Sequence, residues 1–180
     1  MVSRKHLITL IGVLFLVPLF IAACGGTGSG DGGTSNTAPT ATSAPAATPL
    51  PGHHGVGEQV AVGSTFKVTI NSVKTSKGGS FSTPGAGNIY VVVDVTVMNV
   101  STTKQPVSSL LSFTLKDTAG KEYDESIAPD VGTPPDGDVE ANNQLKGQLV
   151  YEVPTAQKQF NLTFISDLLG TDMAVWDLSL

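Results

Sequence analysis

A run of alternating side chains at residues 88–99, NIYVVVDVTVMN, constrains the fold of this chain more than any other segment. From Ile89 to Val97 every second residue is a branched apolar one, and an extended chain places such residues on one face. The opposite face carries Tyr90, Val92, Asp94, Thr96 and Met98. We therefore predict a central β-strand with one apolar face. We expect Asp94 on the outer, wetter face, as a solubilising or cross-strand polar residue.

The same period of two recurs through residues 56–180. Apolar and polar residues alternate in further runs that begin at Phe66, Leu111, Leu145 and Phe160, and a last run spans residues 174–180. Gly, Pro and Asp, which favour turns, separate these runs. No stretch longer than one turn has helical periodicity. The pattern predicts seven to eight antiparallel strands in two sheets packed face to face.

The first 24 residues are typical of an export signal. A basic start, MVSRKH, precedes an apolar run of seventeen residues that ends at Cys24, the only cysteine of the chain. The sequence IAAC, at residues 21–24, resembles the bacterial lipoprotein box, in which cleavage precedes a cysteine that carries diacylglycerol. We expect a signal peptide at residues 1–23, acylation (including palmitate) of Cys24, and attachment to the outer face of the bacterial cytoplasmic membrane. The alternative is an uncleaved membrane anchor.

Residues 24–55 have the composition of a linker. Gly, Ser, Thr, Ala and Pro dominate, and such a segment buries too little apolar surface to offset the entropy of ordering its backbone. We expect a disordered tether that holds a domain of residues 56–180 away from the membrane. His53 and His54 lie at its end, and we expect them to be solvated, because no third histidine follows that could complete a metal site.

The order of four segments carries a family resemblance. VGEQVAVGSTFKVTINSVK is followed by NIYVVVDVTVMNVS, FTLKDTAGKEYD and LKGQLVYEVPTAQKQFNLTF. This order resembles a widespread, functionally uncharacterised family of bacterial lipoprotein domains. The resemblance implies an all-β, immunoglobulin-like antiparallel sandwich, similar to telokin and to a secreted mycobacterial immunoprotective antigen. It implies no catalytic residues.

Missing residue types limit the chemistry of the domain. Residues 56–180 contain no His, Cys or Arg, which excludes His-dependent triads, thiol nucleophiles, zinc sites and arginine clamps there. Without Arg4 and Lys5 the chain keeps eight Lys against fifteen acidic residues, so nucleic acid is not an expected partner. We expect no enzymatic activity, no cofactor and no metal ion. A carboxylate-based envelope hydrolase stays open as the least favoured reading.

The acidic residues concentrate in one segment, residues 124–144, which holds six acids and no base. The six are Asp124, Glu125, Asp130, Asp136, Asp138 and Glu140. Their mutual repulsion and three prolines predict a solvated, partly disordered loop without ladder pairing, which could be shortened at little cost in stability. A partner-contact loop and a weak cation site are the alternatives.

These features together predict a membrane-anchored cell-surface lipoprotein. Its immunoglobulin-like domain would act as a non-catalytic binding module for an unidentified envelope or extracellular protein. A small-ligand or weak cation-binding lipoprotein is the main alternative. The oligomeric state is left open.

Overall fold

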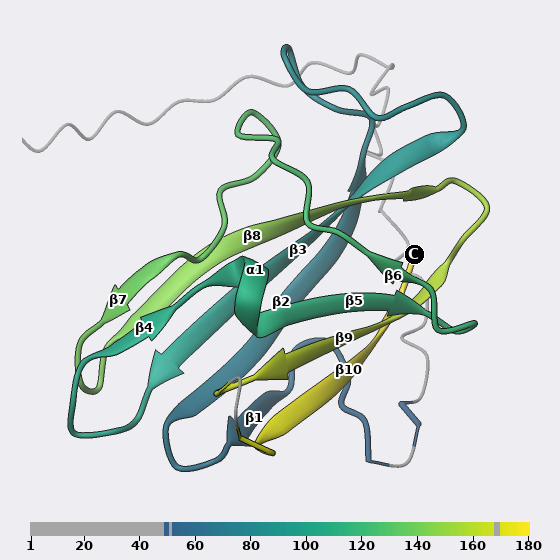
Figure 1. Ribbon diagram of the computed structural model, residues 1–180. Coiled ribbons are helices and arrows are strands. Elements are labelled where there is room, and N and C mark those ends of the chain that lie inside the picture. Colours follow the sequence, from purple (N-terminus) through teal and green to yellow (C-terminus); the bar gives the residue numbers. More distant parts are fainter. Residues whose placement is uncertain (1–48, 51, 168–169) are drawn as a thin grey trace, which may run out of the picture. The chain divides into compact units, whose positions relative to one another are not determined.

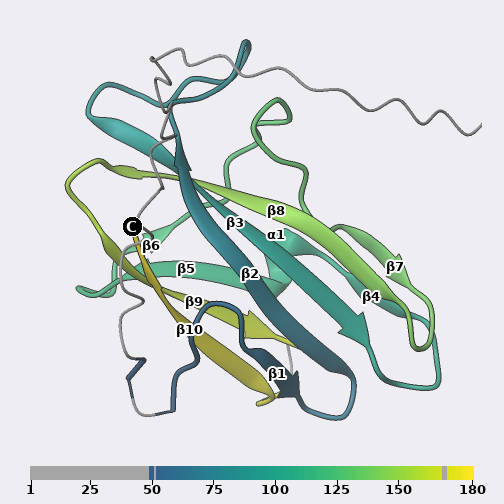
Figure 2. The ribbon, with the colours of Figure 1, turned by 180° about the vertical axis from the view of Figure 1, so that it is seen from behind.

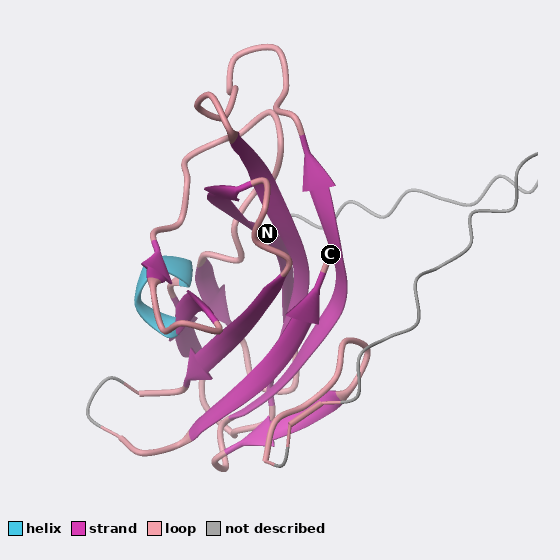
Figure 3. Ribbon diagram, turned by 90° about the vertical axis from the view of Figure 1, so that its right-hand side faces the viewer, coloured by secondary structure: helices cyan, strands magenta, loops and turns pink. Residues whose placement is uncertain are grey.

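The strands predicted from the alternation of apolar and polar residues pack as two layers. The computed structural model describes residues 49–50, 52–167 and 170–180, so the predicted signal peptide, Cys24 and most of the predicted tether lie outside the described residues. One antiparallel sheet has the strand order β1-β2-β3-β8, and the other has the order β10-β9-β5-β6 (Figures 1 and 2). Seen from the side, nearly all regular structure in the described residues is strand (Figure 3).

The first sheet consists of β1 (Gln59–Val62), β2 (Phe66–Ser76), β3 (Asn88–Asn99) and β8 (Gln144–Pro154). The second consists of β10 (Met173–Ser179), β9 (Gln159–Ile165), β5 (Phe113–Asp117) and β6 (Glu122–Tyr123). Beside them, β4 (Gln105–Val107) pairs with β7 (Gly137–Val139), and one helical turn, α1 (Ser109–Ser112), precedes β5.

The eight strands of the two four-stranded sheets confirm the predicted all-β, immunoglobulin-like sandwich. The strand expected to start at Leu111 starts at Phe113 instead, because Leu111 belongs to α1. Within the part of the chain that the structure describes, no helix has the length and apolar character needed to cross a membrane.

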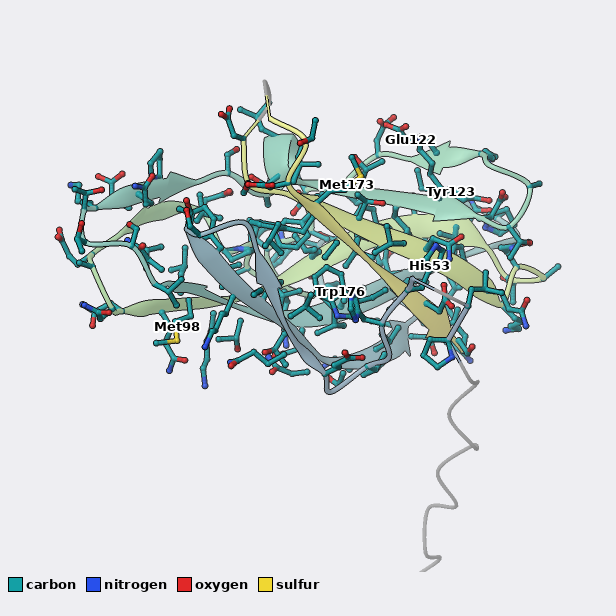
Figure 4. All side chains as sticks on the ribbon, turned by 90° about the horizontal axis from the view of Figure 1, so that it is seen from below. His53, Met98, Glu122, Tyr123, Met173 and Trp176 are labelled. Atoms are coloured by element: carbon teal, nitrogen blue, oxygen red, sulfur yellow. The ribbon has the colours of Figure 1, made fainter. Side chains whose placement is uncertain are left out.

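The apolar face of β3 forms the centre of the core. The four valines at odd positions from Val91 to Val97 have no exposed surface, and they share one buried cluster with apolar residues of the second sheet. Phe66 and Phe164 meet between the sheets edge to face, with ring centroids 5.7 Å apart, and Trp176 lies between the layers (Figure 4). Burying one such aliphatic side chain contributes about 1.5–3 kcal/mol, against about 0–1 kcal/mol for an exposed ion pair. The apolar contact between the sheets therefore contributes more to the stability of the domain than the surface ion pairs do.

The second face of β3 is only partly the wet face that we expected. Asp94 is half-buried, and its Oδ1 accepts a hydrogen bond from Asn71 Nδ2 at 2.6 Å, which confirms its role as a cross-strand polar residue. Asn71 is available because the β2–β3 register shifts between Ile70 and Ser72. Tyr90 and Val92, however, are buried in a small second core with Ala128, Val131 and Val150. An additional segment must therefore cover this face.

That segment is residues 126–135, from the acidic region. Ser126 N donates to Val150 O at 2.7 Å, and Gln148 N donates to Thr133 O at 2.7 Å, so the segment is bonded to β8 at two points. The backbone of Pro134 and Pro135 lies so close to Gly147 that a Cβ at this position would collide with it. The expectation of a loop without ladder pairing is wrong, since Glu125 bridges to Tyr151 and residues 137–139 form β7. The expected solvation holds for five of the six acids, which are exposed.

The two histidines at the end of the predicted tether are also packed. His53 Nδ1 lies 2.6 Å from Asp177 Oδ1, and the ring centroid of His54 lies 5.9 Å from that of Trp176. His54 N donates to Val175 O at 2.8 Å and Asp177 N donates to His54 O at 3.0 Å, so the chain here runs along β10. The expectation that both histidines are solvated is wrong, because Trp176 and Asp177 give them an apolar and a polar partner that lie more than 120 residues away.

Replacing Gly147 by Ala should destabilise the domain although alanine is ordinarily tolerated in a strand. The added Cβ meets backbone atoms of Pro134 and Pro135, so either β8 or the covering segment must shift, at a cost of about 1–3 kcal/mol. Urea unfolding measures the loss, and faster hydrogen exchange at the amides of Ser126 and Gln148 locates it.

Gly55→Ala is the matched control, because a Cβ at Gly55 meets only Pro49 Cγ at 3.4 Å, an ordinary contact. Equal stability of the Gly147→Ala and Gly55→Ala proteins would contradict the close packing of residues 126–135 on the sheet.

Candidate functional site

The candidate site lies at the edge of the sandwich where β8 of one sheet and β6 of the other are the outermost strands. From β6 the chain crosses β8 and then reaches β7 (Figure 1). Glu125 forms an isolated antiparallel bridge with Tyr151 of β8 at this crossing. The covering segment therefore passes over the gap between the sheets, and residues at its start lie near the sandwich interior.

The six acids predicted as a contact loop are distributed among different partners. Asp130 Oδ2 accepts from the amides of Phe81 and Ser82 at 2.6 and 3.2 Å, and Asp138 Oδ2 lies 2.7 Å from Lys104 Nζ. Hydrogen bonds from Ser82 and Phe81 hold the pKa of Asp130 below its ordinary value. These two acids fasten loops rather than form a common site.

Of the remaining four acids, only two come together. Asp124, Asp136 and Glu140 are exposed, and Glu125 is half-buried. Asp136 Oδ1 accepts a hydrogen bond from Ser109 N at 2.6 Å and thereby holds the start of α1. Glu125 and Asp136 both line one pocket, which also borders α1 and β8.

This edge pocket, as we call it, has a volume of about 250 Å³ and mostly apolar walls. Apolar walls come from Leu110, Ile127, Ala128, Pro129, Pro134 and Val150. Polar groups come from Ser109, Glu125, Ser126, Thr133, Asp136 and Gln148. No basic side chain is among its lining residues. Leu110 and Ile127 are strongly exposed, at 68% and 94%, so apolar surface also extends beyond the pocket.

Buried polar atoms without partners gather at this pocket. Ser109 is 1% exposed, and neither its Oγ nor the buried Oε2 of Glu125 makes a hydrogen bond. The hydroxyl of Tyr151, close to Glu125, is likewise buried and without a partner. Each such group costs about 1–3 kcal/mol relative to its bonded state, and native proteins contain few of them. Two of these atoms, Ser109 Oγ and Glu125 Oε2, belong to lining residues of the pocket, whereas Tyr151 belongs to the core between the sheets. This buried pair makes the pocket a candidate ligand site.

The electrostatics of the pocket centre on Glu125. Burial raises the pKa of its carboxyl group above the ordinary value; the Ser109 side chain opposes this rise, and the charge of Asp136 adds to it. Burial and the nearby Glu125 also raise the pKa of Tyr151, which keeps the phenol protonated. The pocket thus offers the carboxyl group of Glu125 and the hydroxyl group of Ser109 next to apolar walls.

A wider depression lies on the other side of the covering segment, where Asp94, Asp130, Lys146 and Gln148 line a volume of about 440 Å³. It is open to solvent, and its carboxylates already have partners, Asn71 for Asp94 and the 81–82 amides for Asp130. Among the described residues no group of three or more His, Cys, Asp or Glu side chains gathers as a metal site. The edge pocket is therefore the stronger candidate.

Sequence reasoning named Glu125 and Asp136 but missed Ser109, Leu110 and Val150. Serine and leucine residues before a predicted strand have no pattern that distinguishes a pocket wall from a turn. The two apolar residues Tyr90 and Val92 on the expected wet face were a usable signal, because they require a cover and thus predict packing of a loop on this sheet.

Comparison with known proteins gives a family and a fold. A family described as a domain of unknown function (DUF4352) matches residues 54–175. The yjhA protein of Bacillus subtilis is 18% identical, with a TM-score of 0.56, over 71% of this chain and 99% of that chain. MPT63, a secreted protein of Mycobacterium tuberculosis, is 16% identical, with a TM-score of 0.52, over 73% of this chain and 98% of that one.

A third similar structure is larger. It is ycdA of Bacillus subtilis, described as a "putative lipoprotein", at 16% identity and a TM-score of 0.57. The match covers 66% of this chain but 38% of ycdA, so this chain spans well under half of that protein. No curated protein matches the sequence. At these identities the structural similarities show the fold alone.

Replacing Glu125 by Gln should raise stability increasingly as the pH rises. Because the folded-state pKa of Glu125 lies above its unfolded value, the folded protein holds this proton more tightly, and that contribution is lost as the pH rises through the folded pKa. Glutamine stays neutral, so the Glu125→Gln protein becomes more stable than the parent as the pH rises above about 4.5. Urea unfolding of both proteins from pH 3 to 8 measures the difference.

Glu152→Gln provides a control of opposite sign. Hydrogen bonds from Asn88 and Gly85 hold the pKa of Glu152 below its ordinary value, so its contribution is present at neutral pH and is lost as the pH falls. A pH-independent difference for Glu125→Gln, with the expected slope for Glu152→Gln, would contradict the assignment of Glu125 as a buried carboxyl.

Proposed function

This chain belongs to the DUF4352 family, and on that premise we propose that it is a lipid-anchored envelope protein whose sandwich presents a non-catalytic binding site, the edge pocket. The buried, unpartnered polar atoms of that pocket carry the binding role. The IAAC box and Cys24 support the anchor, and so does the description of two proteins of the same fold, one as a lipoprotein and one as secreted.

The polar groups of the edge pocket are suited to binding rather than to catalysis. Ser109 is the nucleophilic side chain with the deepest burial in the pocket, but no histidine or lysine lines the pocket to take its proton. The carboxyl groups of Glu125 and Asp136 belong to a pocket of about 250 Å³, below the 300–1,000 Å³ typical of drug-sized ligand sites. A group the size of one side chain fits this volume, whereas a sugar chain between two catalytic carboxyls does not.

Such a pocket serves either a side chain of a partner protein or a small free ligand. The exposed Leu110 and Ile127 next to it favour a protein partner, because a protein surface would cover them together with the pocket. We propose an envelope or extracellular protein as the partner of the displayed domain.

The anchor is tested by replacing Cys24 with Ser in the full chain expressed in its native host. The parent should incorporate labelled fatty acid and partition into the detergent phase, whereas Cys24→Ser should do neither. Thr34→Ala, beyond the box, is the control and should behave as the parent. Fatty acid on the Cys24→Ser protein would overturn the lipoprotein assignment.

The binding role is tested with a neutral probe of the right size, 1-butanol, added to the full chain in nonionic detergent. Amide chemical shifts of residues around the edge pocket, such as Ser109, Leu110 and Val150, should move in a saturable way. Residues on the far side of the sandwich, such as Ser179, serve as the internal control. If neither this probe nor its charged analogues shift the pocket amides, the proposed binding site is wrong.

A further inference from the structure

The chemistry of the edge pocket selects among ligands by charge. Two carboxyl groups, those of Glu125 and Asp136, line it, and no Lys, Arg or His does. An anion in this pocket would meet the negative charge of these two carboxyl groups without a basic side chain to balance it, which weakens its binding. The arrangement therefore disfavours carboxylate and phosphate ligands and favours groups that donate hydrogen bonds.

The buried acceptor atoms of the pocket determine which donor group of a ligand can bind there. Glu125 Oε2 and Ser109 Oγ are both buried, and neither has a partner at full hydrogen-bond geometry. The Ser109 hydroxyl acts as a donor that lowers the pKa of Glu125, so the two side chains face each other. A serine hydroxyl that donates to a carboxylate can still accept a hydrogen bond from a ligand. One donor group with two or more N–H bonds can reach both acceptors. A primary ammonium has three such bonds on a single atom, and its charge is matched by the carboxylate.

Most of the remaining surface of the pocket is apolar, which determines the kind of chain that the ligand carries. Leu110, Ile127 and Val150 line the space around the acceptors. A short methylene chain attached to the ammonium would contact these side chains, and each CH₂ removed from water tightens binding. A hydrated metal cation has no such chain and would leave the walls in contact with water.

From this juxtaposition we propose that the edge pocket binds a primary ammonium group on a short apolar chain. Glu125 Oε2 and Ser109 Oγ accept its hydrogen bonds, and Leu110, Ile127 and Val150 contact the chain. Asp136, whose Oδ1 accepts the Ser109 amide, adds negative charge at the same site. The inference rests on the proposed binding role of the pocket and specifies its ligand. Both a free alkylamine and the lysine side chain of a protein partner have this chemistry.

Three probes with four carbon atoms each test the charge preference on the full chain: n-butylammonium, 1-butanol and butanoate, each titrated at pH 7.5 with the pocket amides as the readout. We expect n-butylammonium to bind at least tenfold more tightly than butanoate. Equal or tighter binding of butanoate overturns the proposal. If 1-butanol binds and no charge preference is found, the pocket still binds and only the ammonium assignment fails.

Variants then test which groups accept the ammonium. Glu125→Gln should weaken n-butylammonium about tenfold and leave 1-butanol unchanged, because the amide keeps the shape but loses the charge. Glu122→Gln is the control: it removes an exposed carboxylate that pairs with Lys116 outside the pocket. An unchanged preference for n-butylammonium in Glu125→Gln overturns the role given to Glu125. Asp136→Asn retains an acceptor for the Ser109 amide and should weaken the cation by less than Glu125→Gln does.

The source of the ammonium is distinguished by two further probes, N-acetyl-lysine amide and a pentapeptide with lysine at its centre flanked by apolar residues. A lysine from a partner protein would bring cover for the exposed Leu110 and Ile127, so the pentapeptide should bind more tightly than n-butylammonium. Tighter binding of the free amine than of both lysine probes supports a small amine. Either result supports the ammonium site, and absence of binding by all ammonium probes overturns it.

Discussion

Burial of β3 on both faces is the constraint on which the rest of this molecule depends. Its odd positions are covered by the second sheet, as in any sandwich, but Tyr90 and Val92 on its other face need a cover as well. Residues 126–135 supply it, and to do so the chain must leave β6, cross the edge of the sandwich and pack on β8. The edge pocket exists because of this crossing, since Glu125 is carried to the gap between the sheets by the same segment that seals the outer face.

The sequence predicted the fold because alternation is a local property. Six runs of period two could be assigned from neighbouring residues, and they correspond to six of the eight strands in the two facing sheets; the short strands β1 and β6 lie in none of these runs. The acidic region could not be assigned in this way. Its charges are balanced by partners far away in the sequence, such as the Phe81 amide for Asp130 and the Ser109 amide for Asp136, which are 49 and 27 positions distant. The repulsion between neighbouring acids can be read from the sequence, whereas the hydrogen bonds that they accept from distant amides cannot.

The candidate site illustrates the same division. Glu125 and Asp136 stood out as acids, but four similar acids stood beside them, and nothing in the local sequence separates a carboxylate that fastens a loop from one that lines a pocket. The distinction comes from burial: Glu125 Oε2 is buried without a donor, whereas Asp130 and Asp138 have amide or ammonium donors. In this domain a buried carboxyl oxygen without a donor, rather than the densest group of acids, identifies the site.

The contacts of residues 50–54 with β10 determine where a mechanical load enters the domain. Leu50 N and His53 Nδ1 both lie 2.6 Å from the carboxylate of Asp177, and His54 pairs with the β10 backbone in a parallel bridge. A pull applied to the chain before Leu50 therefore acts first on Asp177, which Asn161 holds from the neighbouring strand β9. The contacts of Asp177 and Asn161 pass this force to β10 and then to β9. Tension on this chain would thus enter the second sheet at its edge strand β10, while β6 and the edge pocket lie at the opposite edge.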